Sequence, residues 1–136
     1  MAKKKAGDGA RERPEVIVEF LFERGVLSLS IRNIGSRAAM KIGVSFDRKF
    51  TGLGGEKEIS SLPLFTRVEF LGPDREIVTL LDTSASYFKR KQPTKIAARV
   101  SYLDAEDRKY ETTIHHDLEI YRDLSWVSST TDHEVH

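Results

Sequence analysis

The chain has 136 residues, of which 39% are apolar and 32% are charged, and its formal net charge at pH 7 is +1. This length predicts one domain, and the balanced charge excludes a strong overall field that would attract nucleic acid or a membrane. The chain has no cysteine, which excludes disulfides, thiol catalysis and thiolate metal sites, and no apolar run approaches the ~20 residues of a membrane span.

The composition and the N-terminal sequence predict a soluble, cytoplasmic protein without a signal peptide. The first residues include lysines, but no apolar stretch follows them as it would in a secretory signal. The lack of cysteine fits a reducing compartment. A piece of an exported or membrane-anchored protein would have the same sequence, so that alternative stays open.

Both ends of the chain are predicted to be disordered. Residues 1–13 contain five basic and two acidic side chains and no large apolar residue except Met1. Residues 125–136 are polar after Trp126 and end in SSTTDHEVH. Segments that bury little apolar surface cannot offset the entropy lost on folding. We therefore expect a basic tail at 1–13, a folded domain at 14–124 and a polar tail at 125–136.

The folded part begins with alternating apolar and polar residues. Residues 14–23 (PEVIVEFLFE) predict a first strand, and a turn at Gly25 leads into the next segment. The stretch 26–46, VLSLSIRNIGSRAAMKIGVSF, contains two alternating runs separated by turn formers such as Asn33 and Gly35. Because side chains alternate between the faces of a strand, one face of each run is predicted to be buried.

Further strand patterns follow along the chain. A flexible loop is predicted at 47–58, and Pro63 interrupts an apolar segment at 59–71, which predicts two short strands at an edge or crossover. More strands are predicted at 76–82, 94–103 and 109–121. The whole pattern predicts an all-β antiparallel sandwich of roughly seven to nine short strands. The predicted core contains Leu29, Ile31, Val44, Phe46, Val100 and Tyr102.

Three blocks of residues carry a resemblance to a known family. They are Leu29, Ile31, Asn33, Gly35, Ala38, Val44 and Phe46; then Leu71, Pro73 and Glu76; then Val100, Tyr102 and Asp104. Their order resembles that in bacterial and archaeal immunoglobulin-like modules of the CARDB or NEW3-like kind. The resemblance implies an immunoglobulin-like sandwich from a prokaryotic protein, serving as a non-catalytic spacer or as an adhesive or protein-binding unit. The chain departs from the family pattern at Asp74, where glycine is usual, and in its long apolar insertion 47–68.

The histidines and serines form no catalytic or metal-binding pattern. His115 and His116 are adjacent, so on a strand they point to opposite faces and cannot bind one metal ion without a bulge. No serine lies in a Gly-x-Ser-x-Gly motif, and GLGG at 52–55 has no helix pattern behind it to hold a phosphate. We therefore expect a protein that is not an enzyme and has no cofactor or metal.

The leading functional hypothesis is a protein-interaction or structural module, acting through a sheet edge or through residues 47–70. Pro63 prevents continuous strand pairing, so some apolar side chains near it are expected to stay exposed. The predicted contact residues for a protein partner or a homodimer are Leu64, Phe65 and Val68. In the alternative interpretation, these side chains fold back and cap the open end of the sandwich.

The second hypothesis is an accessory protein that binds nucleic acid or an anionic surface. The segment Tyr87-Phe88-Lys89-Arg90-Lys91 interleaves aromatic and basic side chains, which suits stacking on bases and contact with phosphate. In the alternative interpretation, an aromatic residue fills the end of the sandwich and the basic run is a solvated loop. The predicted contacts to nucleic acid or anionic lipid are Lys3, Lys4, Lys5, Lys89, Arg90 and Lys91.

Overall fold

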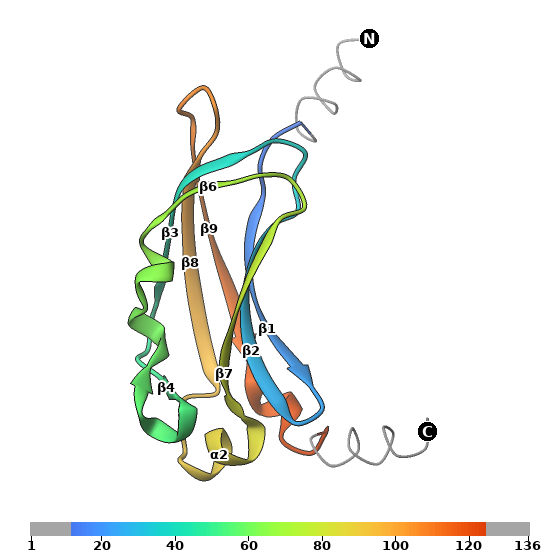
Figure 1. Ribbon diagram of the computed structural model, residues 1–136, viewed down its shortest axis with the longest axis vertical. Helices are drawn as coiled ribbons and strands as arrows, with labels where there is room; N and C mark the ends of the chain where they lie inside the picture. The colour runs from blue at the N-terminus through green and yellow to red at the C-terminus, as the bar shows by residue number, and fades with distance from the viewer. Residues whose placement is uncertain (1–11, 125–136) are drawn as a thin grey trace.

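The computed structural model of the chain describes residues 12–124, which fold into two antiparallel β-sheets packed face to face (Figure 1). One sheet has the order β1–β2–β7, formed by Val16–Glu23, Val26–Asn33 and Glu76–Thr83. The other has the order β6–β3–β8–β9, formed by Val68–Leu71, Ala39–Phe46, Lys95–Leu103 and Lys109–Asp117. A two-stranded ribbon pairs β4 (Thr51–Gly52) with β5 (Lys57–Glu58). The predicted all-β antiparallel sandwich is confirmed.

Five short helices lie in three regions of the described chain where the sequence predicted loops or strands. The first region holds η1 (Leu53–Gly55), η2 (Ile59–Ser61) and η3 (Pro63–Phe65), the second holds α2 (Ser84–Lys89), and the third holds η4 (Leu118–Tyr121). Pro63 starts η3, where its missing N–H is not needed. The segment 59–71, predicted to form two short strands, therefore contains one strand, β6. The strand predicted at 109–121 ends at Asp117. The Asp117 carboxylate accepts a hydrogen bond from Glu119 N (3.0 Å) and so caps the N-terminus of η4, which follows.

The core lies between the two sheets and is built from alternate residues of the strands. Five of the six predicted core residues are buried: Leu29, Ile31, Val44, Val100 and Tyr102. The sixth, Phe46, is half-buried and packs against the core, with its ring centroid 5.0 Å from that of Phe50 and 5.0 Å from that of Phe65. The predicted facing of these strands is therefore correct, and Phe46 lies at the margin of the core.

The sandwich extends to residues before the predicted domain boundary. Arg13 O accepts a hydrogen bond from Ser36 N (3.0 Å), and the Glu12 carboxylate lies 2.6 Å from the Arg37 guanidinium. These two residues of the predicted basic tail are therefore attached to the turn between β2 and β3. Residues 1–11 and the predicted polar tail at 125–136 lie outside the described residues.

One buried amide joins the two sheets near the upper end of the sandwich. Asn33 is fully buried, and its Oδ1 accepts hydrogen bonds from Glu15 N (3.1 Å) and Gly35 N (2.9 Å). Its Nδ2 donates to Arg37 O (2.8 Å) and Leu71 O (3.0 Å). One side chain thus binds the start of β1, the turn after β2 and the end of β6, and all of its hydrogen-bonding capacity is used.

Replacing Asn33 with alanine is expected to lower the free energy of unfolding by at least about 2 kcal/mol, because each buried backbone group left without a partner costs about 1–3 kcal/mol. Urea denaturation followed by circular dichroism measures the effect. Arg32→Ala, at the exposed neighbouring position, is the matched control and should change stability by less than about 0.5 kcal/mol. Equal losses in the two variants would show that the amide does not hold this end of the sandwich.

Candidate interaction surface

The sandwich has two flanks where the edges of the sheets meet solvent, and the flank between β1 and β9 is closed by side chains. The His116 ring packs edge-on against Phe20 at 5.1 Å between centroids, and Tyr121 stacks on Phe22 at 5.3 Å. The Arg13 guanidinium lies over the Tyr110 ring at 5.8 Å. This flank therefore presents little uncovered apolar surface.

The opposite flank is formed by β6, the turn 72–75 and the first part of β7, Glu76–Leu80; we call it the β6–β7 flank. In Figure 1, β6 crosses the upper end of the sandwich and continues into β7. Three large apolar side chains on it are exposed: Phe70 by 62%, Val78 by 51% and Leu80 by 49%. Exposed apolar groups of this kind mark interaction sites when they lie together.

The register of β7 explains why two of these side chains are uncovered. Val78 lies opposite Ser30 on β2, and Leu80 lies opposite Ser28. The two serines are too small to cover their larger neighbours across the strand pair, and β7 has no neighbour in the sheet on its other side. The outer face of the sheet therefore ends in two apolar side chains, next to Glu76, whose carboxylate accepts a hydrogen bond from Ser30 Oγ (2.7 Å).

The exposed edge of β7 has definite limits. At its lower end, Gly52 lies so close to β7 that an added Cβ atom would be 2.0 Å from Leu81 O, and Gly54 N donates to Asp82 Oδ2 (3.3 Å). At its upper end lies a pocket of about 290 Å³. The pocket is lined by Phe70, Leu71, Gly72, Arg75, Glu76 and Ile77. Between these limits the edge of Glu76–Leu80 is open among the described residues.

The structure separates the three residues predicted as protein contacts. Phe65 is 1% exposed and its ring packs against Phe46, so it is part of the core and is not on the surface. The physical reason is that η3 turns its ring inward. Leu64 and Val68 are half-buried and also pack against the core, and Val68 begins β6 beside the β6–β7 flank.

The contact residues predicted from the sequence do not include Phe70, Val78 and Leu80. Their signal was present, because 76–82 reads as a nearly continuous apolar run in a strand that the structure puts at the edge of its sheet. Recognising it required the strand order, which the sequence did not supply.

Arg90, predicted as an anion contact, is engaged inside the fold. Its guanidinium donates to Asp82 Oδ2 (2.5 Å), Thr51 Oγ1 (2.6 Å) and Thr51 O (3.1 Å). Burial alone would raise the pKa of Asp82, but hydrogen bonds from Arg90 and from backbone groups outweigh it and hold that pKa below its ordinary value. The Arg90 side chain thus turns back onto β4 and β7, where it is used in the fold, and an anion contact by Arg90 stays a prediction.

The aromatic residues beside Arg90 also have structural roles. Tyr87 is buried and its hydroxyl donates to Pro93 O (2.6 Å). Phe88 is half-buried, and the Arg122 guanidinium lies 4.4 Å from the centre of its ring. Tyr87 thus fills the end of the sandwich, as in the alternative interpretation. Lys89 and Lys91 are exposed, while Lys3, Lys4 and Lys5 lie outside the described residues.

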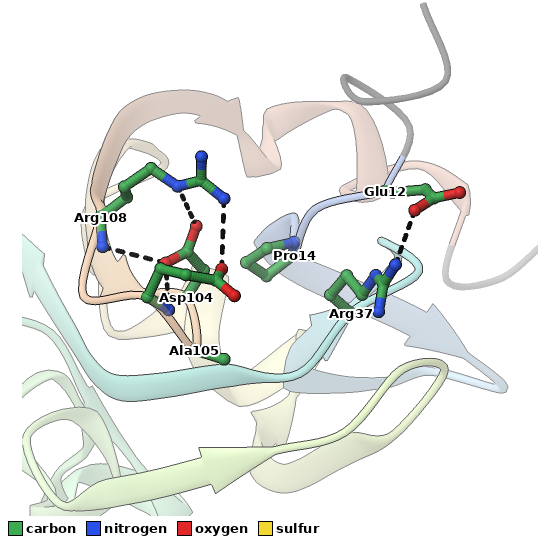
Figure 2. Close-up of a pocket in the computed structure, with 7 residues that line it drawn as sticks. Glu12, Pro14, Arg37, Asp104, Ala105 and Arg108 are labelled. Carbon is green, nitrogen blue, oxygen red and sulfur yellow. Dashed lines mark hydrogen bonds and ion pairs between the residues drawn. The ribbon is translucent and has the colours of Figure 1, made fainter. Parts of the chain in front are cut away.

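A charged pocket of about 460 Å³ lies at the upper end, between the β8–β9 turn and the β2–β3 turn (Figure 2). Asp104 Oδ1 accepts hydrogen bonds from the backbone N–H groups of Glu106 and Arg108, both at 2.9 Å. Its Oδ2 accepts from Arg108 Nε (2.8 Å) and Tyr110 Oη (2.9 Å). The carboxylate of Asp104 is thus fully used in shaping the turn.

The electrostatics of Asp104 follow from these bonds. Burial would raise the pKa of Asp104, but the hydrogen bonds from Arg108, Tyr110 and Glu106 prevail and lower it from 3.8 to about 2. The group is therefore ionised throughout the neutral range and cannot act there as a general acid or base, which needs a pKa near the working pH.

Residues 2–122 match a family model described as a domain of unknown function, DUF8453. The chain belongs to the DUF8453 family. No curated protein and no solved structure was found to match it. The match covers the whole sandwich as far as Arg122, so the two sheets, the β6–β7 flank and the charged pocket are all parts of the DUF8453 domain.

Further features of the described part of the DUF8453 domain concern metal ligands, membrane-spanning helices and buried histidines. Within residues 12–124, no cluster of three or more His, Cys, Asp or Glu could hold a metal ion, and no helix is long and apolar enough to cross a membrane. Burial lowers the pKa of His116, which is half-buried, whereas its neighbour His115 is exposed. The two histidines therefore differ in burial, as strand alternation predicts.

Replacing Arg90 with alanine is expected to lower the free energy of unfolding by about 3 kcal/mol, because it leaves the buried Asp82 carboxylate without its cation. Lys89→Ala, at the exposed neighbouring position, is the matched control and should change stability by less than about 0.5 kcal/mol. Thermal and urea unfolding measure both. If Arg90→Ala kept its stability and instead lost affinity for single-stranded DNA, Arg90 would be a ligand contact after all.

The depressed pKa of Asp104 predicts a specific acid sensitivity. Its stabilising effect is fully present above the unfolded pKa of 3.8 and is lost as the pH falls through 3.8 towards about 2. Asp104→Asn should therefore be less stable than the wild type at neutral pH, and this difference should shrink in acid. Urea unfolding at a series of pH values measures it, with the exposed Glu106→Gln as control. Parallel curves for wild type and Asp104→Asn would contradict the assignment.

Proposed function

We propose that the DUF8453 domain is a non-catalytic interaction module that binds a protein partner through the β6–β7 flank. The observation that carries this proposal is the pair of exposed apolar side chains Val78 and Leu80 beside the open strand edge of β7, with the exposed Phe70 of β6 lining the pocket at its upper end. Interfaces concentrate apolar and aromatic side chains at their centre and charged groups at their rim. The flank has this composition, since Arg75 and Glu76 border its pocket.

We further propose that the sandwich is immunoglobulin-like. The order β1–β2–β7 corresponds to strands A, B and E of that fold, and β3, β8 and β9 correspond to strands C, F and G. The fourth strand, β6, pairs with β3 in the second sheet instead of joining the first. Two landmarks of the CARDB and NEW3-like resemblance, Asn33 and Asp104, make the hydrogen bonds that hold turns in this domain. They support a likeness in fold and carry no information about a ligand.

The non-catalytic part of the proposal rests on how the buried acids are used. Asp82 is paired with Arg90, and Asp104 is paired with Arg108. Both carboxyl groups have a pKa below the ordinary value, so both remain ionised at neutral pH. Such groups serve the fold and are unsuited to proton transfer near neutrality.

No group of exposed basic side chains in the described residues supports the anion-binding hypothesis as the exposed apolar side chains support protein binding. Arg90 is engaged with Asp82, which leaves Lys89 and Lys91 as the predicted cations in the described part of the chain. Two exposed lysines provide little counterion release, and strong binding to phosphates needs several such contacts. Binding by Lys3, Lys4 and Lys5 stays a prediction from the sequence.

The combined substitution Val78→Asp and Leu80→Asp tests the proposed flank. Charged groups in the apolar edge should reduce partner binding at least about tenfold, since the loss of about 1.4 kcal/mol has that effect. The measurement is quantitative affinity capture from an extract of the source cells, with the captured proteins identified by mass spectrometry. Ile120→Asp is the matched control, because Ile120 is equally apolar and 63% exposed, and lies outside the flank in η4.

Circular dichroism and thermal unfolding must first show that the doubly substituted protein is folded. The expected result is a set of proteins that the wild type and Ile120→Asp retain and that the flank variant loses. Capture of the same proteins by all three forms would mean that the flank is not the binding surface.

A further inference from the structure

The backbone of β7 is the least protected strand edge among the described residues. Natural sheets shield their edges with lysine, proline, bulges, very short strands or a covering segment. The strand EIVTLLDT contains neither lysine nor proline, and its irregularity against Leu27 and Ser28 lies at the end that Gly52 already covers. By contrast, β6 has four residues, and β9 carries Lys109. The edge of β1 is covered by η4, where the Tyr121 hydroxyl donates to Phe20 O (3.5 Å).

The open part of this edge is short. It extends from Glu76, where β7 begins after the turn 72–75, to Leu80, because Gly52 packs on Leu81 below it. Five residues of strand span about 17 Å. A stable interface between two globular proteins needs about 800 Å² from each partner. A five-residue edge with two exposed apolar side chains, Val78 and Leu80, suits a linear segment better than a second folded surface.

A second copy of the chain fits the same edge poorly. In antiparallel pairing of β7 with its copy about Val78, Leu81 of one copy would lie opposite Arg75 of the other. The segment Gly52–Gly55 is packed on β7 at this position, so it would meet the 72–75 turn of the other copy. An isolated extended peptide carries no such obstruction.

The side-chain surroundings define what the segment must contain. A peptide strand beside β7 directs alternate side chains to the outer face, where Val78 and Leu80 are exposed. The pocket of about 290 Å³ at the upper end of the edge has Phe70 and Ile77 in its lining and can receive one further apolar side chain. Backbone hydrogen bonds supply affinity in this mode of recognition, and the alternate side chains supply specificity.

We infer that the β6–β7 flank binds a short extended peptide segment with apolar side chains at alternate positions, added along Glu76–Leu80 as a fourth strand of the sheet β1–β2–β7. This inference rests on the proposed function and names the form of the partner. It accounts together for the open edge, the pocket that ends it and the outward-facing Val78 and Leu80.

The probe is a displayed library of random short peptides, selected on the immobilised full chain, with the Val78→Asp/Leu80→Asp protein used to remove unrelated binders. Recovered peptides should share apolar residues at every second position. Hydrogen–deuterium exchange of the full chain with a recovered peptide should protect the edge-facing amides between Glu76 and Leu80. The affinity should fall at least about tenfold in the flank variant and stay unchanged in Ile120→Asp.

N-methylation of the recovered peptide tests the strand geometry directly. Only alternate amides of an added strand point towards β7, so methyl groups on one alternating set should abolish binding and those on the other set should be tolerated. Equal losses for both sets, or protection of residues outside β7, would overturn the inference.

Other outcomes separate this inference from the proposed function. If analytical ultracentrifugation showed a dimer that the flank substitutions dissolve, a second copy would be the occupant, and the peptide inference would fail while the flank remained the binding surface. If no peptide were recovered although captured proteins still depended on Val78 and Leu80, the partner would be a folded surface, and the inference would again fail. If captured proteins were unaffected by the flank substitutions, the proposed function itself would fail.

Discussion

The buried side chain of Asn33 is the interaction on which this arrangement depends. Its amide satisfies four backbone groups from β1, the β2–β3 turn and β6, which belong to both sheets. Its own backbone also accepts a hydrogen bond from Asp74 N (2.9 Å) and donates one to Arg75 O (3.1 Å). Leaving buried backbone groups unpaired costs free energy, so the hydrogen bonds of Asn33 to Leu71, Asp74 and Arg75 fix the position of the 72–75 turn. That turn in turn sets the pocket and the upper limit of the open edge of β7.

A second polar cluster holds the other end of the same edge. Arg90 joins Asp82 at the end of β7 to Thr51 in β4, and Gly52 then packs directly on Leu81. The ion pair is partly shielded from water, so its charges interact more strongly than a pair on the surface would. The two polar clusters thus bracket a short apolar edge, and they explain why the open part of β7 is confined to five residues.

The structure also separates two kinds of apolar segment that look alike in sequence. The residues around Pro63 form 3₁₀ turns, and Phe65 from this segment completes a row of rings with Phe46 and Phe50. The side chains of the nearly continuous apolar run in β7 point alternately to the two faces of the sheet, and those on the outer face stay uncovered because small serines lie beside them on β2. Local sequence marked both segments as apolar. Their lateral neighbours made one of them core and left the other on the surface.

The sequence by itself determined the strands, their inward faces and most of the core, because a period of two residues is a local property that each strand carries alone. It also marked Asn33 and Asp104 as landmarks and predicted the turns near them. Only the tertiary structure decided which strands lie at sheet edges, that Arg90 turns inward on α2, and that Phe70, Val78 and Leu80 are exposed while Phe65 is buried. The physical reason is that exposure depends on which segments lie side by side. Those neighbours are distant in sequence: β7 pairs with β2 some fifty residues before it, as the pairing of Val78 with Ser30 shows.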